Sequence, residues 1–370
     1  MYWFVFAWAA SLKRDEEYTP TSKLGKVLIL IPVGRESKVD LKSVDSILWQ
    51  KYPSELFKVV VIADQIKPTT LFQLKKMGVQ VLEAFMSSSN KTKALKYAMN
   101  YFDEGLFDIV VVLNVTSSVT PYFVSEVNRV YQAGFKAMQI SVISKESDLR
   151  AVLLNGVSKE IDQSILCRGH VRLGLSSGLL GTGMAFDFGW FRKNVYELLS
   201  VKGERELQLL LAKQSIPIAF VESVSVCEDR KQPPRQESLI RVEPLSERYH
   251  LIRRNLPQFV SSLVARKWDL ADALYQTLLP SRLIASGMIL IIAALMTIVD
   301  SASAIKWWGL LGLLIVSLIF SMPDRLFTSK FYSSLVMIPR LFISGAPELF
   351  RWKRRVKKIM IQTKRKRRKK

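Results

Sequence analysis

The residues that could do chemistry stand where buried strands are expected to end. Asp64 closes the apolar run 57–64, and Asn114 and Thr116 stand at the end of the apolar run 107–114 or just after it. A strand of an α/β sheet delivers its carboxyl end to a ligand site, where carboxylates often hold a metal ion and phosphates. Asn114 and Thr116 offer an amide and a hydroxyl, which are poor ligands for Mg²⁺ or Mn²⁺. The pattern predicts a strand-end site without the usual metal ligands.

The elements that position these residues alternate along the first third of the chain. Apolar, strand-like runs occupy residues 26–33, 57–64, 79–85 and 107–114. Helical spacing of apolar residues occupies the intervals 39–53, 69–78 and 91–102. This alternation predicts a doubly wound, mainly parallel α/β sheet. Beyond Pro121 the pattern loosens into helices near 124–134 and 203–214, strands near 136–144 and 216–229, and a segment rich in glycine and serine at 169–191.

Composition adds a membrane element to this prediction. The chain has 370 residues, of which 49% are hydrophobic, and a net charge of +22; residues 351–370 hold 13 Lys and Arg and no acid. Residues 283–299 and 307–322 carry no charge, and each is near the lower limit of about 17–25 residues for a spanning helix. They predict a transmembrane helical hairpin, although a buried helix pair stays open as an alternative. Because basic residues follow the second segment, both flanks are expected in the cytoplasm.

Five segments follow one another in the order in which they occur in a known family. They are "ILIPVGRES", "SVDSILWQKYP", "VVVIADQIKPTT", "NKTKALKYAMNYF" and "GTGMAFDFGWFRK". With these motifs the chain resembles a membrane-anchored bacterial glycosyltransferase of family 2, from about residue 26 to the hairpin. The resemblance implies a nucleotide-sugar-binding GT-A-like doubly wound, mainly parallel sheet, followed by interfacial helices and a transmembrane helical hairpin.

The resemblance also implies roles for particular residues. Asp64 would contact the nucleobase, and Lys93 would take part in nucleotide binding; a turn cap at Asp64 stays open. Glu204 stands at the position of the general base, a carboxylate that must reach the acceptor hydroxyl. Gly181, Thr182 and Gly183 would line the acceptor groove, and turn geometry alone is the alternative for the two glycines.

Two of the three catalytic elements of this family are replaced. The metal-binding Asp-x-Asp falls on Asn114 and Thr116, and the Gln-x-x-Arg-Trp falls on residues 240–244, where Pro244 would interrupt a helix. The first hypothesis is therefore a catalytically inactive protein, without metal or other cofactor, that acts as a scaffold or partner subunit in envelope or polysaccharide assembly.

The alternative is an active glycosyltransferase that moves a sugar from a nucleotide-sugar to a polysaccharide or lipid acceptor. Its non-standard site would be metal-independent, with the metal's charge replaced by Lys93, Arg168 or Arg172. Only under this alternative would the nucleotide-sugar be a partner, and only there would Mg²⁺ or Mn²⁺ come into question as a cofactor.

Six segments describe the predicted domain organisation. They are an N-terminal apolar anchor and linker (1–25), the GT-A-like domain (26–237), amphipathic interfacial helices (238–280), the transmembrane hairpin (281–322), further interfacial helices (323–350) and the basic tail (351–370). We expect a bacterial inner-membrane protein with its main domain and tail in the cytoplasm. Membrane lipids would bind the hairpin and tail, and a second membrane or envelope-assembly protein would be a partner. Nucleic-acid binding by the tail is the less favoured alternative.

Cysteine and histidine usage argues against two further classes of site. Cys167 and Cys227 lie far apart, without a CxxC or Cys/His cluster, which excludes a disulfide framework and a zinc site. They are predicted to be small buried hydrophobic residues. His170 and His250 are predicted to be packing or surface residues.

Overall fold

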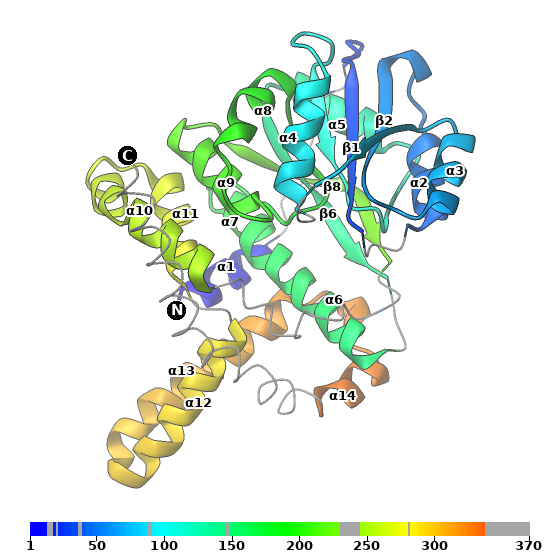
Figure 1. Cartoon of the computed structure of the whole chain (residues 1–370). Helices are drawn as coiled ribbons and strands as arrows, with labels where there is room; N and C mark the ends of the chain where they lie inside the picture. The colour runs from blue at the N-terminus through cyan, green and yellow to red at the C-terminus, as the bar shows by residue number, and fades with distance from the viewer. Residues whose placement is uncertain are drawn as a thin grey trace, which may run out of the picture. The chain divides into compact units, whose positions relative to one another are not determined.

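The computed structural model describes residues 1–12, 18–19, 21–35, 39–86, 90–145, 149–229, 245–279 and 282–336 (Figure 1). The chain divides into two compact units. The first, the α/β unit, contains Trp8–Lys145 and Lys159–Arg230; the second, the helical unit, contains Met1–Ala7, Glu146–Ser158 and Lys231–Lys370. The predicted counterpart of the Gln-x-x-Arg-Trp motif and the basic tail lie outside the described residues.

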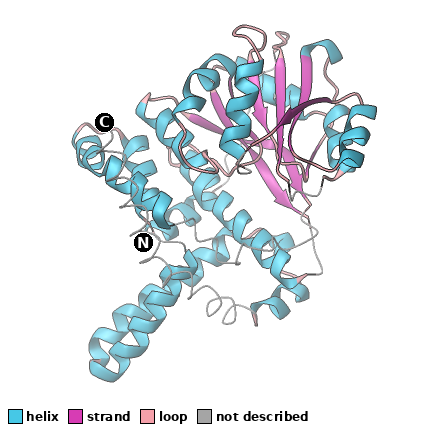
Figure 2. Ribbon diagram, viewed as in Figure 1, coloured by secondary structure: helices cyan, strands magenta, loops and turns pink. Residues whose placement is uncertain are grey.

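Eight strands of the α/β unit form one mixed sheet (Figure 2). The spatial order of the strands is β3-β2-β1-β4-β7-β6-β8-β5. Their bounds are β1 Val27–Val33, β2 Phe57–Asp64, β3 Gln80–Ala84, β4 Ile109–Val112, β5 Ser117–Val119, β6 Ala137–Ser144, β7 Met184–Asp187 and β8 Ile218–Glu228.

Helices pack on both faces of this sheet. Within the described part of the α/β unit they are α2 Leu41–Leu48, α3 Pro68–Lys76, α4 Lys91–Tyr101, α5 Phe123–Gln132, α7 His170–Arg172, α8 Phe188–Asn194 and α9 Glu204–Lys213, with 3₁₀ turns at Ser54–Leu56 and Val195–Glu197. α6, Arg150–Gln163, continues into a π-helix, Ser164–Gly169. Side chains of α2, α3 and α5 share one core with the sheet, and those of α4, α8 and α9 share the other. β1 is apolar throughout because helices cover both of its faces.

The parallel half of the sheet and the strands predicted near 136–144 and 216–229 are confirmed, whereas β5 and β7 are strands that the sequence pattern does not predict. β3, β2, β1 and β4 pair in parallel, as the strand–helix alternation predicts. β7 pairs antiparallel with β4 and with β6, and β5 pairs antiparallel with β8. The sheet is therefore mixed, although β6 and β8 pair in parallel. β7 and β5 are only four and three residues long, and strands this short give little sequence signal.

The helical unit contains the end segments of the chain. Its helices are α10 Leu245–Val264, α11 Trp268–Leu278, α12 Arg282–Val299, α13 Ser301–Ser321 and α14 Ser329–Leu335, with a 3₁₀ turn at Asp324–Leu326. The predicted N-terminal apolar segment is a helix, α1 Tyr2–Ser11, whose first residues belong to this unit. The Tyr2 hydroxyl donates to Asp272 Oδ1 at 2.6 Å, and the Tyr2 ring lies 4.9 Å from the ring of Tyr275.

α12 and α13 form a helical pair, but only one of them has the length of a membrane span. Trp308 Nε1 of α13 donates to Thr297 Oγ1 of α12 at 3.1 Å. Among the described residues, Ser301–Ser321 alone is long and apolar enough to cross a membrane; the apolar part of α12, Ile284–Val299, is shorter. At about 1.5 Å per residue, its 16 residues cover less than the roughly 30 Å of a hydrocarbon core. The described residues therefore contain one candidate span and no clear transmembrane hairpin.

Candidate active site

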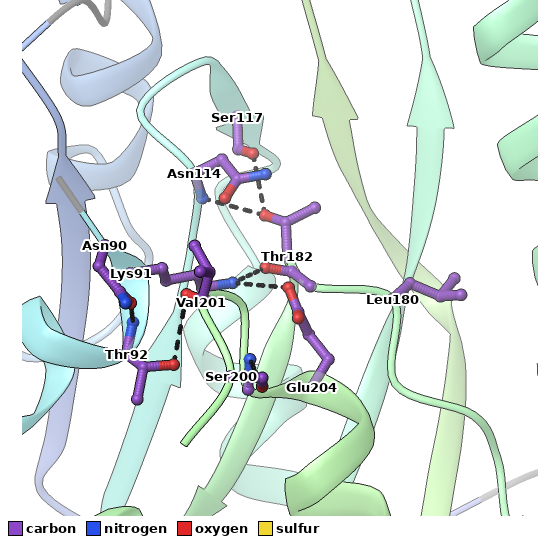
Figure 3. Close-up of polar contacts among 12 residues, drawn as sticks. Asn90, Lys91, Thr92, Asn114, Ser117, Leu180, Thr182, Ser200, Val201 and Glu204 are labelled. Atoms are coloured by element: carbon purple, nitrogen blue, oxygen red, sulfur yellow. Dashed lines mark hydrogen bonds and ion pairs between the residues drawn. The ribbon is translucent and has the colours of Figure 1, made fainter. Parts of the chain in front are cut away.

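Asn114 follows β4 and is fixed by contacts from the loop 180–183 and from β8. Its backbone N–H donates to Thr182 Oγ1 at 3.0 Å, and Thr182 Oγ1 lies 3.0 Å from Ser117 Oγ (Figure 3). The side-chain nitrogen of Asn114 donates to Glu228 Oε1 at 3.0 Å. Glu228 Oε2 accepts from Lys159 Nζ. The Asn114 amide, at the first predicted metal position, is therefore held by a buried carboxylate at the end of β8.

The loop 180–183 bends through two glycines in the left-handed region. The φ angles are +92° at Gly181 and +66° at Gly183, a conformation that favours glycine. Gln139, buried in β6, holds this loop from the sheet. Its Nε2 donates to the Thr182 carbonyl at 2.8 Å, and its Oε1 accepts from the Leu180 N–H at 2.8 Å. The loop conformation therefore depends on the two hydrogen bonds of Gln139 as well as on the two glycines.

Glu204 is the first residue of α9 and lies against this loop (Figure 3). Its Oε1 lies 3.5 Å from Lys91 Nζ, and Lys91 also donates to the Gly181 carbonyl. A Cβ atom at Gly181 would stand 2.5 Å from Glu204 Oε1, so the loop and the carboxylate are in close contact. The side chains of Lys91 and Glu204 are 15% and 16% exposed. A partly buried carboxylate and ammonium therefore meet beside the predicted acceptor loop.

The first turn of α4 positions Lys91. Asn90 caps this helix, because its Oδ1 accepts from the backbone N–H groups of Thr92 and Lys93 at 2.9 and 3.4 Å. Thr92 Oγ1 donates to the Val201 carbonyl at 3.3 Å, next to the start of α9. Lys93, the predicted nucleotide-binding residue, is exposed two residues further along. The cation that meets Glu204 is Lys91.

Asp64 ends β2 and is 1% exposed. Its Oδ1 accepts from the Met86 N–H at 3.1 Å. Its Oδ2 makes no hydrogen bond within the described part of the chain and faces Arg35 Nε at 3.7 Å. Asp64 does not cap α3, whose N-cap residue is Lys67. A buried carboxylate oxygen without a hydrogen bond is available to a donor on a ligand.

The residues at the Asn114 strand end do not fit a divalent metal. No group of three or more His, Cys, Asp or Glu side chains within the described ranges could hold a metal ion. The Thr116 carbonyl accepts from the Asp229 N–H at 3.0 Å. Asp229 Oδ2 pairs with Lys145 Nζ at 3.2 Å, and the neighbouring Glu228 pairs with Lys159. Because Mg²⁺ and Mn²⁺ need several oxygen ligands at once, this donor set is not a site for them.

The two arginines proposed as substitutes for metal charge pair elsewhere. Arg168 Nε donates to Glu222 Oε1 at 2.8 Å. Arg172 donates to the carbonyl of Ala10. Neither contact joins the group around Asn114 and Glu204.

His170 and Cys167 have packing roles. His170 is fully buried, with Nδ1 2.7 Å from the Ile165 carbonyl. Cys167 Sγ donates to the Gly178 carbonyl at 3.4 Å, and burial raises the pKa of this thiol to about 12. The second thiol, Cys227, is only partly buried. The side chain of His250 lies outside the described part.

Four residues of the site are missing from the sequence predictions: Lys91, Gln139, Lys159 and Glu228. Lys91 had a usable signal, because it follows Asn90, a preferred N-cap residue, and so starts a helix. Gln139 had another, since a polar residue inside an apolar strand needs a buried partner. Lys159 and Glu228 are 69 positions apart, and no local pattern joins them.

No protein-family model and no curated protein matches this chain. Among solved structures it is similar to a mannosyltransferase from Pyrobaculum calidifontis in complex with GDP-Man and Mn²⁺, with 16% identity, a TM-score of 0.49, and coverage of 86% of this chain and 93% of that one. It is also similar to residues 1–349 of TarS from S. aureus in complex with UDP-GlcNAc, with 14% identity, a TM-score of 0.48 and coverage of 88% and 89%. A third is GalNAc-T7 with UDP, GalNAc and Mn²⁺, at 11% identity, a TM-score of 0.43 and coverage of 68% and 54%.

The mixed eight-stranded sheet with helices on both faces is similar to the GT-A-like fold of these glycosyltransferases. The sequence leaves enzyme activity uncertain and leans against it; the comparison contradicts that leaning, because the similar structures are glycosyltransferases. At 11–16% identity the likeness concerns the fold and does not identify the catalytic residues of this chain. The side chains at the two predicted metal positions, Asn114 and Thr116, are neutral, and the carboxylate of Glu204 lies at the start of α9.

Proposed function

We propose that this chain is a membrane-associated glycosyltransferase that moves a sugar from a nucleotide-sugar to a hydroxyl of a polysaccharide or lipid acceptor, without a resident divalent metal. The observation that carries the proposal is the contact of Glu204 with Lys91 beside the Gly181 carbonyl. A carboxylate that is partly buried and held at one end of a helix suits a general base.

In this proposal Glu204 accepts the proton of the acceptor hydroxyl. The acceptor oxygen forms a bond to the anomeric carbon of the sugar as the bond from that carbon to the diphosphate oxygen breaks. The nucleoside diphosphate leaves with the electron pair. Lys91 fixes the orientation of the Glu204 carboxylate before the acceptor arrives, which lowers the entropic part of the barrier.

Asp64 is proposed to contact the nucleobase. Its Oδ2 is buried and has no hydrogen bond in the described part, so an N–H group of the base would supply the missing donor. Arg35, whose side chain is 41% exposed and lies 3.7 Å from that oxygen, would border the same position. Its exposure leaves it room to move aside when the base enters.

The membrane assignment rests on α13 and on charge. α13 has the length and composition of a span, and the basic residues that follow it in sequence favour a cytoplasmic side. We propose a bacterial inner membrane in which α12 accompanies α13 across the bilayer, so that the α/β unit and the basic tail lie on the same, cytoplasmic side, where donor nucleotides are made. Anionic lipids would bind the tail, and the acceptor or a second envelope-assembly protein would be met at the membrane.

Release of nucleoside diphosphate from a panel of UDP- and GDP-sugars, with membrane extract as the acceptor source, tests the proposal. The wild-type protein should release UDP or GDP from at least one donor. Glu204→Gln should lower that rate by about 10²–10⁴-fold, the usual range for a lost general base. Glu197→Gln, at an exposed carboxylate in the 3₁₀ turn before α9, is the matched control and should retain the wild-type rate. Equal rates for wild type and Glu204→Gln would contradict the proposal.

A further inference from the structure

A chain of polar contacts crosses the candidate site from α9 to α6. Its middle members, Lys91, Thr182 and Asn114, are drawn in Figure 3. In order, the contacts join Glu204 to Lys91, Lys91 to the Gly181 carbonyl, Thr182 Oγ1 to the Asn114 N–H, Asn114 Nδ2 to Glu228, and Glu228 to Lys159. In this chain of contacts, the ammonium groups of Lys91 and Lys159 therefore lie on opposite sides of Asn114.

Among the described residues, the carboxylate that contacts Asn114 pairs with an ammonium. When an Asp-x-Asp site binds a divalent cation, its net charge is zero, because two negative carboxylates face two positive charges. Here Asn114 and Thr116 are neutral, and the one carboxylate bonded to Asn114, Glu228, pairs with Lys159. A divalent cation added at this point would meet an ammonium instead of free carboxylates. Coulomb repulsion opposes such binding, most strongly where burial lowers the effective dielectric.

The position of Lys159 is fixed by its own helix. Two other side chains of α6 accept hydrogen bonds from the backbone of β6: Gln163 Oε1 from the Val142 N–H at 2.6 Å, and Glu160 Oε1 from the Ser144 N–H at 3.0 Å. The side chain of Glu228 is 2% exposed, whereas that of Lys159 is 18% exposed. The carboxylate is thus buried, and the ammonium lies on its outer side on a helix that the sheet holds in place.

We infer that Lys159 takes the place of the divalent cation and holds the diphosphate of the nucleotide donor, an inference that rests on the proposed function. A fixed ammonium stabilises the charge that develops on a leaving diphosphate without reorganising at the moment of reaction. Glu228 and Asn114 keep Lys159 in position, as the ligands of a metal would otherwise do.

Calorimetric titration with UDP and with GDP tests the inference on the full-length protein in detergent. For the nucleotide that binds, the Kd in EDTA should be within about threefold of the Kd in Mn²⁺, because no metal bridges the phosphates. Lys159→Arg, which keeps the charge, should bind with a Kd close to that of the wild type. The double variant Lys159→Met/Glu228→Gln removes both charges and keeps an acceptor for Asn114; it should weaken binding by about tenfold or more, the effect of one lost charge-assisted contact.

Lys145→Met is the matched control for these variants. Lys145 pairs with Asp229, the next residue after Glu228, but its side chain is 62% exposed, and its removal should leave the Kd unchanged. Thermal unfolding by circular dichroism verifies that each variant is folded. Nucleotide binding that needs Mn²⁺, or that is equal in the double variant and the wild type, overturns the inference and leaves the proposed function standing. Absence of UDP and GDP binding to the folded wild type in both buffers overturns the two together.

Discussion

Single residues decide whether the strand-end site can act without a metal. Glu204 and Lys91 supply a carboxylate and an ammonium 3.5 Å apart, and Lys91 also contacts the Gly181 carbonyl. The sequence predicts Glu204 as the base from its place in a family motif, and the structure leaves that role as a prediction while giving it a partner. Lys91 could have been predicted as the site lysine in place of Lys93 only by identifying Asn90 as the N-cap residue of α4, because the two lysines are only two residues apart.

Gly181→Ala should lower donor turnover by at least tenfold. The new methyl group would stand 2.5 Å from Glu204 Oε1 at a φ of +92°, so the carboxylate or the loop must move. Gly134→Ala is the matched control: its φ is +100°, but no heavy atom lies within 4 Å of the added Cβ. Both variants should lose about 1 kcal/mol of stability from the left-handed backbone. Comparable turnover in the two variants would contradict the contact as the cause.

Cys167 should resist alkylation at pH 8 in the folded protein. Its thiol pKa is raised to about 12 by burial, so the reactive thiolate is scarce until the pH approaches that value. In urea the thiol is exposed and should react completely. Mass spectrometry after iodoacetamide treatment measures both states. Full modification of Cys167 under native conditions would contradict its buried packing.

At the scale of elements, the strand–helix alternation predicts half of the sheet. Continuous apolar runs such as β1 predict strands that are covered on both faces, and these strands pair in parallel as expected. β7 could not be foreseen, because four residues between glycine turns and a helix carry no periodic signal. The contact of Lys159 with Glu228 could not be foreseen either, since it depends on where α6 lies across β6 and β8.

Replacing the cap of α4 should weaken both stability and turnover. Asn90→Ala removes the acceptor for two N–H groups and should cost about 1 kcal/mol in the free energy of unfolding. Because Lys91 is the next residue, its contact with Glu204 should loosen and turnover should fall. Asn90→Ser retains a capping oxygen and should restore most of both properties. Urea unfolding measures the stability, and the nucleotide-release assay measures the turnover. An Asn90→Ala protein with wild-type values of both would contradict this role.

At the scale of the whole molecule, the α/β unit carries the candidate site and the helical unit carries the candidate span. Composition predicts membrane association because uncharged segments and a basic end occur together. Of the two predicted spans, only α13 has the length of a span among the described residues, since the apolar part of α12 is shorter. The length of the apolar part, more than its hydrophobicity, distinguishes α13 from α12 as a candidate span.

Labelling of single cysteines tests the proposed membrane orientation. In a Cys167→Ala/Cys227→Ser background, Ser301→Cys places a thiol at the exposed start of α13, and Gln362→Cys places one in the basic tail. A membrane-impermeant maleimide applied to spheroplasts should label position 301 if α12 and α13 reach the outer side together, and position 362 should react only after lysis. Labelling of position 362 alone in intact spheroplasts would reverse the orientation.

The most direct measurement is donor turnover in EDTA, for the donor that the UDP- and GDP-sugar panel identifies. The account predicts that the wild type keeps at least about half of its rate in Mn²⁺, because the charge of the leaving diphosphate is stabilised by side chains of the chain itself. Glu204→Gln should be inactive in the same buffer. Turnover that disappears in EDTA and returns with Mn²⁺, or that persists in Glu204→Gln, would contradict a metal-independent glycosyltransferase acting through Glu204.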